Sequence, residues 1–415
     1  MRTGELRGRE DFEAILVETL RRGWSLQYGS EFRVSLPSRR GEQIWFEQPL
    51  LSALYTRRVE RRVRRYLADS FRYTTVTWRA PAQWVLGTLL STAPALRLRA
   101  SPALSVSPDV ANSESLLVIP GNQRVRIVDF DRGLCRVMLK DGFDSRAIAS
   151  EAAVRGPGHT GPFVSLTTVD LANGWFEEPL IVGFNLARCP PWRDRAGLMC
   201  QAFDKLVAWA RPSYESVDAA AYAAGLVTRI EEQLEQLEER FGPGVGRGVR
   251  ERLVGLQAVA GRLGQTQTAR SHGDFQAANV MVHTPSQQSV QQRSHGPGSS
   301  AASVGSGQTQ VLISDWEYSG RRFYAYDLLR WGLGAGNPPG LAQRIRRFTE
   351  EAKVKEVGLH LPQLADPDWR AGAVALFLIE DQIRALDESL SGRYHTPVLW
   401  SSLVEELREL DSLTS

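Results

Sequence analysis

The sequence has few cysteines and no long hydrophobic run, and each shortage excludes a class of protein. Its three cysteines form no C-x-x-C pair and stand near no histidine cluster, so neither a disulfide framework nor a zinc site is predicted. No window approaches the roughly 18 apolar residues that a membrane-spanning helix needs. The first residues, MRTGELRGREDF, lack the apolar segment of a signal peptide. We therefore expect a cytoplasmic protein without a membrane span.

The charge is nearly balanced, which gives little reason to expect a nucleic-acid partner. The chain of 415 residues has a formal net charge of +3, with 42% hydrophobic and 23% charged residues. These values are typical of a globular protein with two or three domains. Basic residues are concentrated in the first hundred positions, above all in RRVERRVRRY at 57–66. This segment is either a solvated helix face or a surface for an anionic partner, and no nucleic-acid-reading motif accompanies it.

The first 112 residues are interpreted as an N-terminal α/β extension rich in arginine. Within it, apolar residues at helical spacing over 52–69 predict an amphipathic helix whose arginines occupy the other face. A turn-rich stretch, SPALSVSPDVANSES, ends this region.

Residues 113–184 are interpreted as a small β-rich lobe. Three β-patterned runs, SLLVIP, VRIVDF and LCRVML, follow one another across short turns and predict an antiparallel meander. A helix is expected over 145–155, and two further β-like runs lie at 163–169 and 175–184.

Residues 185–415 are interpreted as a larger helical lobe, because apolar residues recur there at helical spacing in six segments. Residues 284–310 are rich in Ser, Gln and Gly and predict a flexible insertion. The insertion separates the apolar runs NVMVH and VLIS, which are expected to pair as a hairpin. The fold class predicted for the chain is therefore α+β, with a small antiparallel β lobe and a larger helical lobe.

Two polar clusters at the ends of these apolar runs indicate a functional site. His272, Asp274 and Asn279 occur in HGDFQAAN, directly ahead of the first run, and Asp315 follows the second run in LISDWE. Carboxylate and amide oxygens are ligands that suit Mg²⁺, which binds one or two protein carboxylates together with phosphate and water. The sequence therefore predicts a magnesium–nucleotide site where the carboxylates of Asp274 and Asp315 and the amide oxygen of Asn279 meet.

The segments HGDFQAAN, ISDWEYSG and AYDLL together resemble the aminoglycoside phosphotransferase and choline kinase-like family. The resemblance implies a two-lobed, protein-kinase-like fold and ATP-dependent transfer of the γ-phosphoryl group to a hydroxyl of a small molecule. The acceptor can be a sugar, an amino alcohol or an aminoglycoside, and GTP is an alternative to ATP. A nucleotide-binding regulatory or scaffold protein of the same fold, without catalysis, is the alternative function.

The resemblance also implies a role for each motif residue. Asp274 would be the catalytic base or would orient the substrate hydroxyl, while Asn279 and Asp315 would hold magnesium. His272 would orient its loop, and Asp327 in AYDLL would support that loop structurally.

The family fold further implies a lysine on the third strand of the small lobe and a glutamate on the next helix. Lys140 and Glu151 fit these places, and their ion pair would hold the lysine against the nucleotide phosphates. The chain has only four lysines, so Lys140 stands out, although lysines at strand ends and solvated helix glutamates are also common. Adenine would bind near the connector at Glu178 and Leu180.

Overall fold

The computed structural model shows an α+β protein that divides into two compact units. It describes residues 3–37, 42–48, 51–74, 77–92, 94, 96, 100–244, 247–283, 309–335, 340–351 and 361–392. The first unit, here called the β-rich unit, comprises Met1–Ala202 and Ala277–Ser314. The second, here called the helical unit, comprises Phe203–Gln276 and Asp315–Ser415. None of the described helices is long and apolar enough to cross a membrane.

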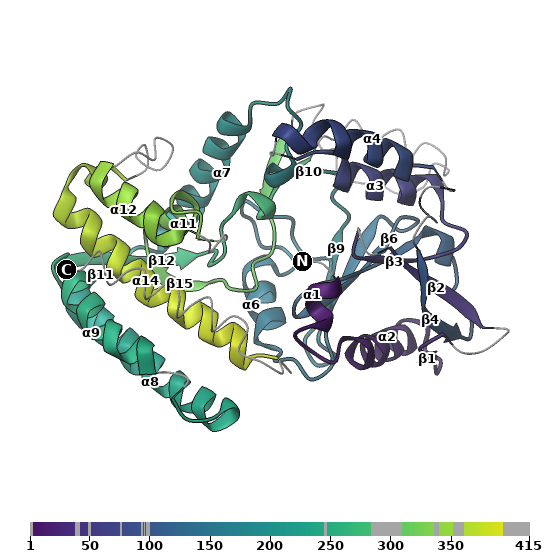
Figure 1. Cartoon of the computed structure of the whole chain (residues 1–415), viewed down its shortest axis with the longest axis horizontal. Coiled ribbons are helices and arrows are strands. Elements are labelled where there is room, and N and C mark those ends of the chain that lie inside the picture. The colour runs from purple at the N-terminus through teal and green to yellow at the C-terminus, as the bar shows by residue number, and fades with distance from the viewer. Residues whose placement is uncertain are drawn as a thin grey trace. The chain divides into compact units, whose positions relative to one another are not determined.

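The β-rich unit is built on a nine-stranded sheet with the strand order β1-β4-β2-β3-β5-β6-β7-β9-β8 (Figure 1). Every described strand pair in it is antiparallel. The predicted meander is confirmed, because β5, β6 and β7 are consecutive neighbours. The strands are β1 (Arg33–Ser35), β2 (Gln43–Gln48), β3 (Ala53–Thr56), β4 (Ser101–Ser107), β5 (Leu116–Pro120), β6 (Arg124–Asp129), β7 (Leu134–Leu139), β8 (Thr168–Asp170) and β9 (Trp175–Pro179).

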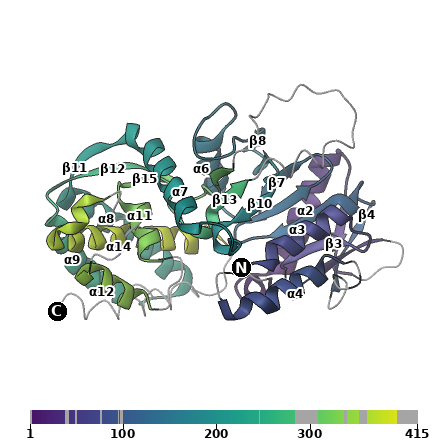
Figure 2. The ribbon, with the colours of Figure 1, turned by 90° about the horizontal axis from the view of Figure 1, so that it is seen from above.

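Helices cover both faces of this sheet. Helix α2 packs on one face, where Trp24 and Trp45 lie in a core of buried aromatic and aliphatic side chains. Helices α3 and α4 pack together on the other side, as both views show (Figures 1 and 2). The predicted helix at 145–155 is confirmed as α6. The helices of this part are α1 (Thr3–Arg7), α2 (Phe12–Tyr28), α3 (Arg61–Arg72), α4 (Ala80–Leu90) and α6 (Arg146–Arg155).

The amphipathic helix predicted over 52–69 is correct only in its second half. Strand β3 takes the first part, with all four of its residues buried, and Leu54 pairs with Val118 of β5. The apolar residues of β3 are therefore enclosed by the sheet and by the helices on the two faces of the sheet. An amphipathic surface helix would not enclose them in this way. The helix α3 begins only at Arg61, and its buried residues are Val63, Leu67 and Ala68.

The boundary expected at residue 112 falls inside one continuous sheet. Strands β1 to β4 come from the N-terminal region, and the pairing of β3 with β5 joins them to the meander. The extension and the β-rich lobe therefore form one compact unit, since a shared sheet buries their apolar faces together.

A second, smaller sheet in the β-rich unit contains segments that were expected in the helical lobe. It has the order β10-β13-β14, formed by β10 (Gly183–Asn185), β13 (Val280–His283) and β14 (Gln310–Ile313). The predicted hairpin pairing is confirmed, because Val280 stands opposite Ile313 in an antiparallel register. The predicted insertion at 284–310 lies almost wholly outside the described residues.

The helical unit contains the expected long helices, and α14 packs on α8 and α9 (Figure 1). It also holds a three-stranded sheet, β11-β12-β15, that the sequence analysis missed. One of the six segments with helical spacing, residues 401–410, lies outside the described residues. The elements are α8 (Ala219–Phe241), α9 (Arg247–Gly261), α11 (Tyr326–Gly332), α12 (Leu341–Glu351), α14 (Pro367–Leu390), β11 (Glu215–Asp218), β12 (Gln265–Ser271) and β15 (Gly320–Phe323), while α7 (Arg195–Ala210) has residues in both units.

Candidate functional site

The loop that follows β12 is fixed to the helical unit by one buried carboxylate. Asp327, at the start of α11, accepts hydrogen bonds from the Ser271 hydroxyl at 2.9 Å and the His272 backbone N–H at 2.7 Å. Its other oxygen accepts from the Gly273 N–H at 2.9 Å. Hydrogen bonds to an ionised acceptor are stronger than neutral ones, so this carboxylate determines the path of the loop directly before Asp274.

Glycine is required at the second position of this loop. Gly273 has a φ of +83°, and a Cβ atom added to it would lie 2.0 Å from the backbone oxygen of Tyr318. A side chain would therefore clash with backbone, besides being strained at a positive φ. The tight approach brings the segment after Asp315 against the loop that carries Asp274.

Asp274 is held by a buried arginine that the sequence analysis missed. The Arg330 guanidinium donates from Nε to Asp274 Oδ1 at 2.9 Å and makes a second contact to the same oxygen through Nη2. The other carboxylate oxygen accepts from Gln276 Nε2 at 2.8 Å. The Asp274 side chain is 14% exposed, against 3% for Arg330. The carboxylate thus has a fixed orientation and still reaches solvent.

A second carboxylate fixes Arg330 in turn. Asp381 on α14 accepts from Arg330 Nη1 at 2.6 Å and from the Tyr326 hydroxyl at 2.7 Å. Burial raises the pKa of Asp381, but Arg384 and Arg330 outweigh burial and hold that pKa well below its ordinary value. The sequence spacing could have identified Arg330 as a candidate site residue. Arg330 follows Asp327 by three residues and therefore lies on the same face of α11.

His272 is fully buried and contacts aromatic rings. Its Nδ1 accepts from the Asp274 backbone N–H at 3.2 Å, and its ring centroid lies 4.6 Å from that of Trp316 in an edge-to-face arrangement. A ring with no solvent exposure that accepts from the loop backbone is suited to positioning the loop rather than to proton exchange with a substrate.

The two expected metal ligands stand at the ends of the paired strands β13 and β14. Asn279 directly precedes β13, and its backbone oxygen accepts from the Ser314 N–H at 2.8 Å. Asp315 is the next residue after Ser314 and has a φ of +71°. Such left-handed backbone is uncommon outside glycine and is concentrated at functional sites. An amide oxygen and a carboxylate are donors that fit Mg²⁺ if phosphate and water supply the other ligands.

The predicted ion pair between Lys140 and Glu151 is not the one that forms. Lys140 is 1% exposed, and its Nζ contacts the carboxylate of Glu10, which precedes α2. The rings of Phe12 and Phe143 also flank Nζ at 5.8 and 5.5 Å. Burial lowers the pKa of Lys140 and outweighs the attraction of Glu10. The N-terminal region therefore supplies the partner that was expected on α6.

Glu151 instead belongs to a buried network of arginines. Its carboxylate contacts Arg124 of β6 and Arg155 of α6, and all three side chains are at most 4% exposed. Arg155 also contacts Glu178 of β9. Arg124, which the sequence analysis did not single out, thus occupies the place expected for the lysine.

The residues of the expected adenine-binding connector make contacts within the β-rich unit. The Leu180 backbone N–H donates to the oxygen of Gly133 at 2.8 Å, and the Glu178 carboxylate contacts Arg155. These groups are engaged within the β-rich unit.

A buried glutamate elsewhere in the helical unit makes stability depend on pH. Glu380 Oε1 accepts from the Phe323 N–H at 2.8 Å and from the Tyr222 hydroxyl, while Oε2 has no hydrogen-bond partner within the described ranges. Burial raises the pKa of Glu380 from 4.5 to about 7, against the opposing effect of Arg322. The stabilisation from the protonated form is complete below pH 4.5 and is lost as the pH rises through 7.

We expect Glu380→Gln to be more stable than the wild type at pH 8, by up to about 3 kcal/mol, with the difference shrinking toward pH 5. Glutamine keeps the acceptor oxygen and removes the cost of ionising a buried acid. Urea unfolding at both pH values measures this. Glu239→Gln, at an exposed position on α8, should leave the pH profile unchanged, and parallel profiles for all three proteins would contradict the role given to Glu380.

The chain is similar to known proteins in structure, whereas no similarity was found from its sequence. No family model matches the chain, and no curated protein matches its sequence. A thermostable mutant of the aminoglycoside phosphotransferase APH(4)-Ia, in a ternary complex with ADP and hygromycin B, is similar at a TM-score of 0.43 and 12% identity, covering 72% of this chain and 92% of that one.

Two kinase structures are also similar. The Plasmodium vivax ethanolamine kinase has a TM-score of 0.42 and 12% identity, and the match covers 83% of this chain and 93% of that one. A choline/ethanolamine kinase family protein from Mesorhizobium loti has a TM-score of 0.34 and 17% identity, with 79% and 99% covered. The chain is thus similar, at TM-scores below 0.5, to an aminoglycoside phosphotransferase and to two kinases.

Proposed function

We propose that the chain is an ATP-dependent phosphotransferase that moves the γ-phosphoryl group to a hydroxyl of a small molecule. The observation that carries this proposal is the loop at Asp274. Its carboxylate is oriented by Arg330, its backbone is fixed by Asp327, and it remains partly open to solvent. A fixed, accessible carboxylate is what is needed to accept or orient the proton of an attacking hydroxyl.

Asn279 and Asp315 are the residues proposed to hold magnesium. Bound Mg²⁺ would neutralise charge on the phosphates of the nucleotide. The backbone bond between Asn279 and Ser314 fixes the start of β13 against the end of β14. Asp315, the next residue after Ser314, has a left-handed backbone conformation with a φ of +71°. The acceptor class, a sugar, an amino alcohol or an aminoglycoside, follows from the resemblance of the motifs.

Thermal melting with ATP or GTP, with and without Mg²⁺, tests the nucleotide site. A nucleotide at a hundred times its Kd stabilises the folded state by about 2.7 kcal/mol, so we expect a magnesium-dependent rise of several degrees in Tm. Asp315→Asn should abolish most of this rise. Asparagine tolerates the left-handed conformation, so the variant removes the charge without adding backbone strain.

Asp368→Asn, at an exposed position in the first turn of α14, is the matched control and should keep the full rise in Tm. The nucleotide assignment fails if neither nucleotide shifts the wild-type Tm, or if Asp315→Asn responds to Mg²⁺ as the wild type does.

A second candidate function is a protein that binds nucleotide without turnover. One observation favours it: Lys140, the expected phosphate-binding lysine, is enclosed with Glu10 inside the β-rich unit. The two candidates differ in a direct assay. Both predict the magnesium-dependent rise in Tm, but only the phosphotransferase converts ATP to ADP when sugars, amino alcohols or aminoglycosides are added.

A further inference from the structure

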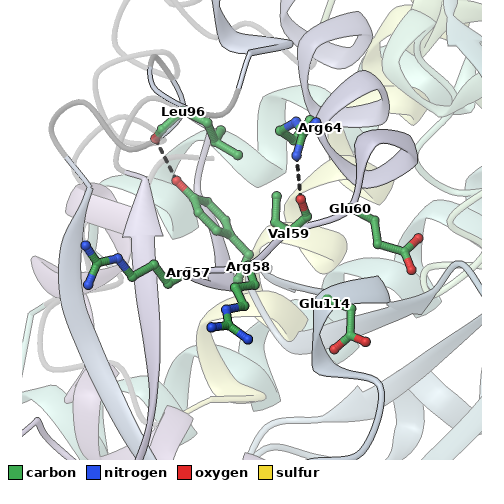
Figure 3. A pocket seen from close by; sticks show the side chains of 8 residues that line it. Arg57, Arg58, Val59, Glu60, Arg64, Leu96 and Glu114 are labelled. Atoms are coloured by element: carbon green, nitrogen blue, oxygen red, sulfur yellow. Dashed lines mark hydrogen bonds between the residues drawn. The ribbon is translucent and has the colours of Figure 1, made fainter.

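A cavity of about 350 Å³ lies in the N-terminal part of the β-rich unit, within the arginine-rich segment. Figure 3 shows the side chains that line it, from the end of β3, the start of α3 and the segment before β5. The guanidinium groups of Arg57 and Arg58 lie on one side, and the carboxylates of Glu60 and Glu114 lie on the other. The cavity contains none of the motif residues discussed above.

Two of the arginines carry charge that no described carboxylate neutralises. Arg64 donates to the backbone oxygens of Val59 at 2.6 Å and Ser91 at 3.3 Å, which are both neutral groups. Arg58 has neither a hydrogen bond nor an ion pair with any residue in the described ranges. Elsewhere in the β-rich unit, arginines such as Arg62 and Arg155 contact carboxylates. The positive charge of Arg58 and Arg64 is therefore not used by an ion pair within the described residues.

One of the two carboxylates at the cavity is engaged by a residue outside it. Glu60 is already paired with Arg62, which does not line the cavity. The Tyr55 hydroxyl donates to the oxygen of Leu96 at 2.8 Å, so the ring is fixed as part of the cavity wall. Backbone contacts likewise hold Arg64 in place. A ligand would therefore meet a wall that is preformed at Tyr55 and Arg64, which lowers the entropic cost of binding there.

We propose that this cavity binds a small phosphate monoester whose organic part carries hydroxyl or amino groups. A phosphate offers three acceptor oxygens and up to two negative charges, which match several guanidinium groups better than a single carboxylate does. Glu60 and Glu114 would repel a second anionic group but can accept hydrogen bonds from hydroxyl or ammonium groups. The volume admits a molecule of a few to about a dozen non-hydrogen atoms.

Isothermal titration of the full chain with glycerol 3-phosphate, and with inorganic phosphate as a minimal probe, tests this proposal. We expect one site per chain, with the monoester binding more tightly than inorganic phosphate. Arg58→Gln should weaken binding at least about tenfold, since hydrogen bonds to charged groups contribute roughly 1.5–3 kcal/mol each. Arg58 is exposed, so its replacement should not impair folding.

Arg61→Gln is the matched control, because Arg61 is exposed on the same segment but does not line the cavity. It removes the same charge and should leave the Kd within about twofold of the wild type. Undetectable binding at millimolar ligand, or equal weakening by Arg58→Gln and Arg61→Gln, would overturn the proposal and identify the segment as a solvated basic surface.

Discussion

Replacing Asp274 with alanine is expected to lower the rate of phosphoryl transfer by about 10²- to 10⁴-fold, the contribution typical of a positioned general base. Nucleotide binding should be largely kept, because Asp274 is proposed to act on the hydroxyl. Arg330 retains Asp381 as a carboxylate partner in the variant, so the helical unit should still fold. The measurement is the initial rate of ADP formation with an acceptor, together with the magnesium-dependent shift in Tm.

The matched control is Asp368→Ala, at an exposed position on α14 of the same unit, which should transfer phosphate at the wild-type rate. Arg330→Met supplies a second comparison. If Arg330 positions Asp274, the loss in rate from Arg330→Met should largely disappear in a background that already lacks Asp274. Wild-type transfer by Asp274→Ala would remove Asp274 from the proposed mechanism.

Replacing Glu151 with glutamine is expected to destabilise the β-rich unit by about 3–5 kcal/mol, the cost typical of removing one partner from a buried ion pair. The carboxylate contacts two arginines, Arg124 and Arg155, in a region where all three side chains are at most 4% exposed. Glutamine has a similar shape but carries no charge to balance them. Urea unfolding followed by tryptophan fluorescence measures the change, because Trp24 and Trp45 are buried in this unit.

Glu31→Gln, at an exposed position between α2 and β1, is the control and should change the unfolding free energy by less than about 0.5 kcal/mol. Glu151→Ala adds a cavity to the loss of charge and should cost more than Glu151→Gln. If both Glu151 variants unfolded at the wild-type urea concentration, the buried network would not be a determinant of stability.

Local sequence patterns predicted those parts of the fold in which neighbouring segments also pair in space. The meander at β5, β6 and β7, the helix α6 and the pairing of β13 with β14 are of this kind. The strand β3 was mistaken for helix because its apolar run fits helical spacing. Its structure is determined by pairing with β2 on one side and with β5, more than 60 residues further along the chain, on the other.

The candidate site shows the same limit. The motif at His272 and Asp274 could be recognised because its residues are close in the sequence. Arg330 was missed because its role depends on which carboxylates it contacts once α11 and α14 are packed. The partner of Lys140 could not be predicted either, since Glu10 lies 130 positions away in the sequence. Side-chain pairing over such separations is decided by tertiary packing rather than by local pattern.

The division of the chain into two units limits how genetic recombination can exchange parts of such a protein. Each unit is assembled from two separate stretches of sequence, so the chain passes between units after residues 202, 276 and 314. A single genetic crossover therefore cannot transfer either unit without also transferring part of the other. A fragment ending at residue 202, for example, would lack β13, the strand that pairs with β10. The passage after 276 also separates Asp274 from Asn279, so recombination at that point would divide the HGDFQAAN motif itself.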